Sequence, residues 1–261
     1  MFKAEIVDLF ESLKRADLWL FLGWHDVRQR YRRSFLGPFW ITLASAFIIG
    51  FMSIVYSGLF RQDIATFMPL AATGLIIWGF ISSCLVDGSS VFIASSATIK
   101  QIPAPLPLHV FRLIWQQAIY LLHNATVIVL VMIFAQVHLA WATLLVFPAL
   151  VLVVANLVWM VILLGSLGAR YRDIPVIIQT FISALFLGTP VFWQISFLPE
   201  DRRWVAYINP FTYLLEVVRI PILGTSPSIG IWGACIGMAV VGWAVALTVY
   251  ARSRSKLAYW I

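Results

Sequence analysis

The chain has 261 residues, of which 62% are hydrophobic and only 11% are charged. Soluble domains carry roughly 25% charged residues, so this composition excludes an ordinary soluble domain and predicts an all-α integral membrane protein. The formal net charge of +7 does not require a nucleic-acid partner, because membrane proteins gather lysine and arginine in cytoplasmic segments.

Residues 1–35 predict a cytoplasmic segment at the membrane interface. The apolar side chains of residues 2–15 share one stripe of a helix, as in helices that lie on a membrane surface or pack on a partner protein. The stretch WHDVRQRYRRSFLGPFW (24–40) then places four arginines directly before a long apolar run. They surround the helix axis, so we interpret them as a collar at the inner headgroups. These are Arg28, Arg30, Arg32 and Arg33.

A transmembrane domain is predicted over residues 36–250. A spanning helix needs about 20 apolar residues. The uncharged stretch before Arg170 is too long for one crossing, so we divide it at a weak break around Gln136–His138. The six predicted spans are about 36–60, 65–86, 113–135, 140–166, 174–192 and 229–250.

Six spans place both ends of the chain on the same side of the membrane. Most of the 18 lysines and arginines lie in the N-terminal segment, the loops 87–112 and 167–173, and the tail 251–261. The positive-inside rule therefore predicts that both termini face the cytoplasm and that the protein lies in the cytoplasmic (inner) membrane. No cleavable signal peptide is visible before the first span, so we expect that span to be retained.

Two segments depart from a simple pattern of spans and loops. The loop 87–112 can form a short helix before PAPLP (103–107), which forbids helix. The outer segment 193–228 is too apolar for an exposed loop and too interrupted to span. Asn209–Pro210 is typical of a helix start, and Pro221 of a helix end. We therefore predict two short re-entrant helices, which membranes tolerate only where backbone is buried in protein or lines a wet cavity.

The motifs for several kinds of chemistry are missing from the sequence. It contains no GxxxxGK[ST], HExxH or GxSxG, and Cys84 and Cys235 lie in separate apolar runs. Acidic residues are nearly lacking within the predicted spans, unlike in many proton-coupled carriers. We therefore expect no catalytic residue, no metal site and no cofactor in this chain, and energy supplied by a partner.

Aromatic residues make up 15% of the chain. Most are expected at the membrane interfaces, but aromatic rings also stack on the apolar faces of sugars. Candidates for lining a glycan path are Phe39, Trp40, Tyr56, Trp78, Phe192, Trp193, Trp204, Tyr207, Phe211 and Tyr213. On the predicted outer helix, Glu216 and Arg219 either pair with each other or, with Asn209, form an outer gate across a dimer axis.

Several stretches, taken together and in order, resemble the ABC-2-type permeases that export polysaccharides. DVRQRYRRSFLGPFW resembles their opening motif, and WGF (78–80) with IKQIPAPLPL (99–108) resembles the loop between their second and third spans. LGARYRDIP (167–175) resembles their second cytoplasmic loop, and TPVFW…NPFTYLLEVVRIPILG resembles their outer segment. PAPLPL is denser in proline than the family pattern.

The resemblance implies the transmembrane subunit of a homodimeric exporter that moves a lipid-linked glycan, with O-antigen as the favoured cargo. A separate ABC ATPase subunit would bind ATP and Mg and rest on the two cytoplasmic loops. The implied coupling residues are Ser95, Ser96, Ile99, Lys100, Gly168, Ala169, Arg170, Arg172 and Asp173. The four opening arginines would gain a second role at the lipid phosphate. The alternatives are a capsule or teichoic acid exporter, a drug or lipid exporter of the same superfamily, and a polytopic membrane glycosyl- or acyltransferase.

Overall fold

A computed structural model describes residues 3–32, 34–37, 39–101, 103–137 and 140–261, and over these ranges the chain is helical without strands. The N-terminal half contains α1 (Lys3–Lys14), α2 (Ala16–Arg30), α3 (Phe39–Phe60), α4 (Ile64–Ser89), α5 (Val91–Ala94), α6 (Ser96–Gln101) and α7 (Pro107–Phe134). The C-terminal half contains the 3₁₀ helix η1 (Trp141–Leu145), α8 (Val146–Arg170), α9 (Ile174–Gly188), the 3₁₀ helices η2 (Ile195–Phe197) and η3 (Glu200–Arg202), α10 (Trp204–Ile208), α11 (Pro210–Ile222) and α12 (Ile229–Trp260).

Five helices are long and apolar enough to cross a membrane: α3, α4, α7, α8 together with η1, and α12. They correspond to five of the six predicted spans. The remaining one, predicted over 174–192, is represented by α9, which ends at Gly188 after 15 residues. At 1.5 Å per residue α9 is about 22 Å long, which is shorter than the roughly 30 Å of hydrocarbon in a bilayer.

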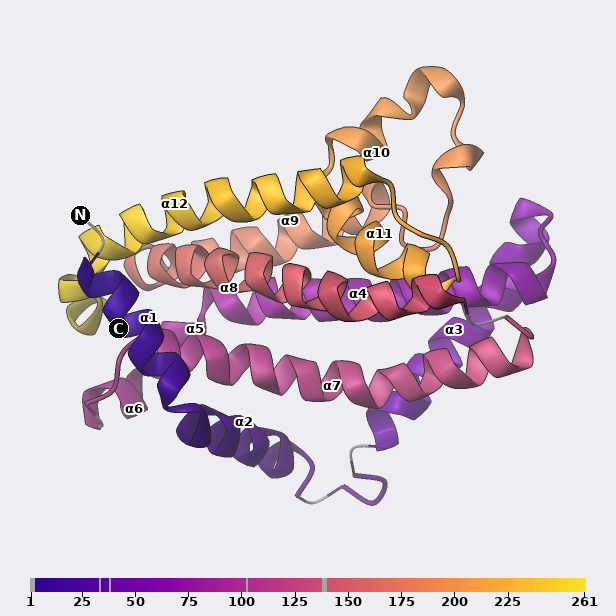
Figure 1. The fold of residues 1–261 in the computed structure, drawn as a ribbon. Coiled ribbons are helices and arrows are strands. Elements are labelled where there is room, and N and C mark those ends of the chain that lie inside the picture. The colour runs from indigo at the N-terminus through magenta and orange to yellow at the C-terminus, as the bar shows by residue number, and fades with distance from the viewer. Residues whose placement is uncertain (1–2, 33, 38, 102, 138–139) are drawn as a thin grey trace.

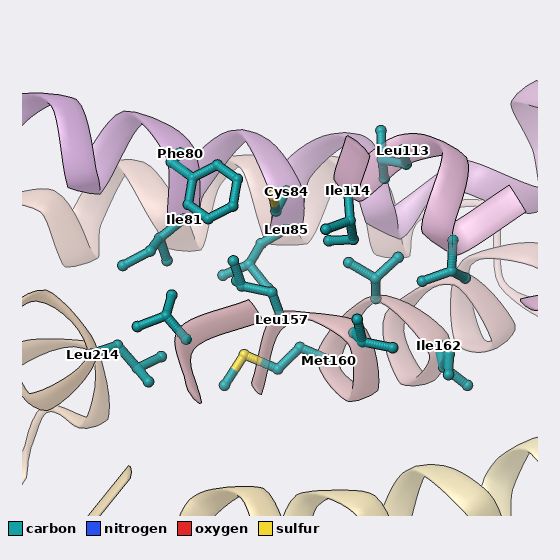
Figure 2. Packing of buried hydrophobic residues seen from close by; sticks show 14 of the residues in the cluster. Phe80, Ile81, Cys84, Leu85, Leu113, Ile114, Leu157, Met160, Ile162 and Leu214 are labelled. Atoms are coloured by element: carbon teal, nitrogen blue, oxygen red, sulfur yellow. The ribbon is translucent and has the colours of Figure 1, made fainter. Parts of the chain in front are cut away.

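Helix α4 lies at the centre of the bundle (Figure 1), where it packs against α3, α7, α8, α9 and α11. The apolar core forms where α4, α7 and α8 meet, as Figure 2 shows for Ile81, Ile114 and Leu157. In the C-terminal half of the chain, the long helix α12 packs along α8. The predicted break between the third and fourth spans is present, because α7 ends at Phe134 and η1 begins at Trp141.

Both ends of the chain lie at the same end of the bundle (Figure 1). They are joined there by Asp8 of α1, which pairs with Arg254 of α12 at 2.5 Å and accepts a hydrogen bond from the Tyr250 hydroxyl at 3.1 Å. This end also carries α5 and α6, the short helices expected in the first half of the loop 87–112.

Helix α1 is amphipathic as predicted, but it turns its polar face toward the protein. Glu5, Asp8 and Ser12 are buried, whereas Ile6 and Phe10 are 42% and 61% exposed. The inward polar face is stabilised by the ion pair to Arg254. The outward apolar stripe therefore remains available to a lipid surface.

Candidate functional site

An aromatic cluster joins α3, α4 and α9 to the outer segment. The Tyr56 and Phe192 ring centroids are 5.1 Å apart, and Phe192 continues to Phe186 at 5.6 Å. Trp78 then contacts Phe186 at 6.2 Å and Phe211, edge-on, at 6.1 Å. These distances fall within the usual range for interacting aromatic pairs. Tyr56, Phe192, Trp78 and Phe211, all predicted aromatic residues, are thus connected in one cluster through Phe186.

The other predicted aromatic residues lie outside this cluster. Phe39 and Trp40 are exposed on α3, and Trp204 and Tyr207 are exposed on the outer segment. Tyr213 donates a hydrogen bond to the main-chain oxygen of Tyr207 at 2.8 Å, and both border an outer cavity of about 630 Å³. Trp193 is partly buried.

A polar groove continues the aromatic cluster along α4 and α9. A cavity of about 420 Å³ lies between these helices, and Trp78 and Phe186 form part of both the cluster and the cavity wall. The rest of the lining combines the apolar Val86 and Ile182 with polar side chains that were not among the predicted path residues: Ser82, Ser83, Asp87, Gln179 and Ser183. Uncompensated polar groups are costly at membrane depth, so this groove is suited to water or a polar solute.

The spacing of these polar residues contains a signal that could have identified the groove. Ser83 and Asp87 are four residues apart on α4, and Gln179 and Ser183 are four residues apart on α9. Residues separated by four positions share a helix face, so each of the two apolar helices carries a short polar stripe.

A second polar cavity, of about 200 Å³, lies where the end of α2 meets α3, α4 and α7. Arg30 borders it together with Ser83, which also lines the α4–α9 groove. Arg30 donates a long hydrogen bond of 3.4 Å to the Tyr120 hydroxyl, which raises the pKa of the guanidinium above its usual value. Burial raises the pKa of Tyr31, so this phenol stays neutral near pH 7. The cavity therefore offers a permanent positive charge among neutral donors.

The predicted arginine collar is divided by the structure. Helix α2 ends at Arg30, so Arg32 lies beyond the helix rather than around its axis. Arg28, Arg30 and Arg32 are all exposed, but of these three only Arg30 borders the cavity. Arg33 lies outside the residues that the structure describes.

Helix α2 is held against α7 by a bidentate ion pair. Arg112 donates to both carboxylate oxygens of Asp26 at 2.6 Å, and both side chains are about one-fifth exposed. Such paired charge-assisted bonds fix orientation as well as contributing energy. This pair sets the position of α2, and hence of Arg30 at its end.

Replacing Asp26 by asparagine should loosen α2 without unfolding the bundle. Because the pair is partly screened by solvent, we expect a cost of about 1 kcal/mol, seen as roughly fivefold faster amide hydrogen exchange in residues 17–30. Asp17→Asn changes an exposed carboxylate on the same helix and is the control. Equal exchange in the two variants would contradict the role of this ion pair.

The outer segment is anchored by Arg219, whose side chain is only 3% exposed. Its guanidinium donates to the main-chain oxygens of Pro190 at 2.5 Å and Val191 at 3.4 Å, and it pairs with Glu216 one turn earlier. Of the two alternatives that the sequence left open, the structure has the pair within one helix. Arg219 therefore donates to the carbonyl groups that follow the end of α9, which buried non-helical backbone requires.

Asn209 and Gly74 complete this anchor. Asn209 caps α11 by accepting a hydrogen bond from the Phe211 amide at 3.0 Å, and Pro210 follows at the first helical position, as predicted. The Asn209 side chain also donates to the Thr189 hydroxyl at 2.8 Å. Gly74 of α4 leaves room for the Val191 carbonyl, since a Cβ there would lie 1.7 Å from its oxygen. These contacts divert the chain after Gly188 and explain why α9 is shorter than predicted.

The two cytoplasmic loops of the sequence prediction lie at the end of the bundle that carries the chain termini. Ser95, Ser96, Ile99 and Lys100 are exposed or partly exposed on and beside α6. In the second loop, Arg170, Arg172 and Asp173 are exposed.

Gly168 and Ala169 differ from the other predicted coupling residues, because they are packing residues and are not exposed in the loop. A Cβ on Gly168 would lie 1.9 Å from the Ser89 carbonyl oxygen, and Ala169 is 1% exposed. Gly168 thus packs where α8 approaches the end of α4, and Ala169 belongs to the main apolar core. Among the described residues, no group of three His, Cys, Asp or Glu side chains could hold a metal ion.

The chain is similar in sequence to a known family and to a curated protein. A family model described as ABC-2 type transporter matches residues 17–223, a range that contains the aromatic cluster, both polar cavities and both loops. The O-antigen export system permease protein RfbA of Myxococcus xanthus is 24% identical over 213 residues, which cover 78% of this chain and 80% of that protein.

Proposed function

Because the chain belongs to the ABC-2 type transporter family, we propose that it is the permease subunit of an ATP-driven exporter for a lipid-linked polysaccharide, with O-antigen as the favoured cargo. The chain is a multi-pass membrane protein with five helices long and apolar enough to span. The cargo assignment is supported by the name of the Myxococcus xanthus relative.

The observation that carries this proposal is that the aromatic cluster and the polar groove along α4 adjoin each other, since Trp78 and Phe186 belong to both. Sugars expose apolar faces that stack on rings and hydroxyl groups that need hydrogen-bond partners. The rings of Tyr56, Phe192, Phe186 and Trp78 would stack on the apolar sugar faces. The polar side chains of the groove beside Trp78 would form hydrogen bonds with the sugar hydroxyl groups. A drug or small-lipid exporter would have less use for the polar groove.

The lipid end of the cargo would meet Arg30. An arginine among neutral donors is suited to a phosphate group, and the Arg30 cavity shares Ser83 with the groove between α4 and α9. The outward apolar stripe of α1 would rest on the same inner leaflet as an interface helix. Arg30 would thus hold the phosphate beside the groove.

Energy would come from a separate ABC ATPase subunit that binds ATP and Mg. In this proposal two copies of the chain form a homodimer in the cytoplasmic membrane, with both termini in the cytoplasm. Helix α9 and residues 189–192 would complete a sixth crossing, and α10 and α11 would be the re-entrant outer helices. The exposed residues of α6 and of the turn Arg170–Asp173 would contact the ATPase.

Other cargoes and other classes of protein remain the alternatives in the test. Capsular polysaccharide and teichoic acid share the chemistry of a lipid-linked glycan and would suit the same cluster and groove. A polytopic glycosyl- or acyltransferase would need clustered acidic or histidine groups at a membrane face. Asp87 accepts a hydrogen bond from Gln117 at 2.8 Å and Asp173 is exposed beside Arg172, which is a weak basis for catalysis.

The proposal is tested by co-expressing the chain with candidate ABC ATPase subunits from the same genome and reconstituting the purified complex in lipid vesicles. We expect the two subunits to co-purify, ATP hydrolysis to require the ATPase, and the lipid-linked glycan to become accessible outside the vesicle only when ATP is present. Vesicles that lack the ATPase are the control. ATP hydrolysis by the chain alone, or modification of the glycan instead of its movement, would contradict the proposal.

A further inference from the structure

The end of α12 lies between the two loops that follow α4 and α8. Lys100 of α6 donates to the main-chain oxygen of Ile261 at 2.6 Å. Arg172, in the turn between α8 and α9, donates to the main-chain oxygen of Trp260 at 2.7 Å. The guanidinium of Arg170 also lies over the Trp260 ring, 5.6 Å from its centroid. Two cationic side chains and one cation–π contact therefore connect both loops to the same two residues.

These two residues are also fixed to the rest of the bundle. Trp260 and Ile261 pack against the main apolar core, as does Ile99 of α6. Two turns earlier on α12, Arg254 pairs with Asp8 of α1. The end of α12 is therefore a packed part of the structure that contacts α1 and both loops at once.

We propose that Trp260 and Ile261 join the two loops into a single mechanical unit, with Trp260 as the positioning residue that holds the Arg170–Arg172 turn. A displacement of either loop then moves the other loop and α12. Chains of packed side chains and hydrogen bonds can carry coupling between separate segments, and residues 260–261 supply such a connection. Its use in transport rests on the proposed function, in which the ATPase pushes on both loops.

The test measures whether a change in one loop is felt in the other. The full-length chain is placed in lipid nanodiscs without the ATPase, and amide hydrogen exchange is followed in Ser96–Gln101 of α6. Arg172→Met removes a donor to Trp260 and is expected to accelerate exchange in α6 roughly fivefold. Lys100→Met should reciprocally accelerate exchange in residues 171–174, because such coupling acts in both directions.

Matched variants separate this connection from a general loss of structure. Arg252→Met removes an exposed arginine from the same helix and should leave exchange in α6 unchanged. Arg172→Lys retains a donor and should restore slow exchange. Trp260→Ala should accelerate exchange in residues 170–174, whereas Trp260→Phe keeps a ring beneath Arg170 and should not. If Arg172→Met and Arg252→Met give the same exchange in α6, the inference is overturned.

The outcome can be distinguished from failure of the proposed function. Affinity for the ATPase is measured for Lys100→Met, Arg172→Met and their combination, in the native chain and in the Trp260→Ala variant. The two changes should be non-additive in the native chain, and this coupling should weaken in Trp260→Ala, which keeps the main-chain oxygens but removes the ring that packs beneath Arg170 and against the core. A chain that binds no ATPase contradicts the proposed function alone, whereas additive effects in both backgrounds contradict the joining role alone.

Discussion

Gly74→Ala is expected to destabilise the folded chain by about 3 kcal/mol. The added methyl group would lie 1.7 Å from the carbonyl oxygen of Val191 and 3.3 Å from its Cα atom. The obstacle is main chain, which Arg219 holds at Pro190 and Val191. It cannot rotate away as a flexible side chain would, so either α4 or the outer segment must shift.

Gly79→Ala is the matched control for this substitution. Gly79 lies on the same helix, but a Cβ at this position meets no atom within 4 Å. Thermal unfolding of both variants in the same detergent should lower the midpoint for Gly74→Ala and leave it unchanged or slightly raised for Gly79→Ala, because alanine favours helix. Equal midpoints would show that the outer segment does not pack tightly against α4.

Arg219→Leu is expected to cost about 4 kcal/mol. Removing one partner of a buried ion pair leaves the other charge without compensation, and here Glu216 would be left in a nearly buried position. The carbonyl groups of Pro190 and Val191 would also lose their donor. Denaturation or proteolysis of the purified chain should reveal the loss first in the segment 189–209.

Two further variants test the cause of this loss. Arg202→Leu removes an arginine from the same outer segment that is 73% exposed, and it should change stability by less than about 0.5 kcal/mol. Adding Glu216→Leu to Arg219→Leu should recover part of the stability, because no unpaired charge remains. If the double variant is as unstable as the single one, the carbonyl contacts rather than the ion pair carry the cost.

Features set by local chemistry could be predicted from the sequence. The family model confirms the recognised family, and the apolar stretches correspond to the long helices because a spanning helix satisfies its own backbone. The start of α11 at Asn209–Pro210 is confirmed, since a side-chain cap and a proline at the first helical position act within a few residues. The helix continues only one residue beyond the predicted stop at Pro221.

Features that depend on contacts between distant residues could not be predicted in this way. The sequence around Gly188 contains no signal that α9 ends there, because the contacts that divert the chain come from Arg219 and Gly74, which are distant in sequence. The helical period of α1 defines a polar and an apolar face. Which face is buried depends on the tertiary contact between Asp8 and Arg254 of α12. Gly168 looks like a flexible loop residue until α4 brings the Ser89 carbonyl beside it.

The candidate site shows the same division. Aromatic residues could be selected by type, yet Trp78 and Phe192 belong to one cluster while Phe39 and Trp40 do not, and only the packing of four segments decides this. Arg30 could not be separated from Arg28 until α7 supplied Tyr120 beside it. The polar stripes on α4 and α9 can be recognised in the sequence. That the two stripes face each other depends on how the helices pack in the tertiary structure.

The 15 residues of α9 also bear on the lipid that surrounds the protein. In the proposed six-span topology, the helical part of this crossing is about 8 Å shorter than the hydrocarbon layer, so the neighbouring acyl chains would compress beside it, at a modest cost for each ångström of mismatch. The bilayer would thus be thinnest beside α9, the helix that carries Gln179 and Ser183. Lipid headgroups that move across the membrane beside α9 would therefore cross a thinner hydrocarbon layer than elsewhere around the protein.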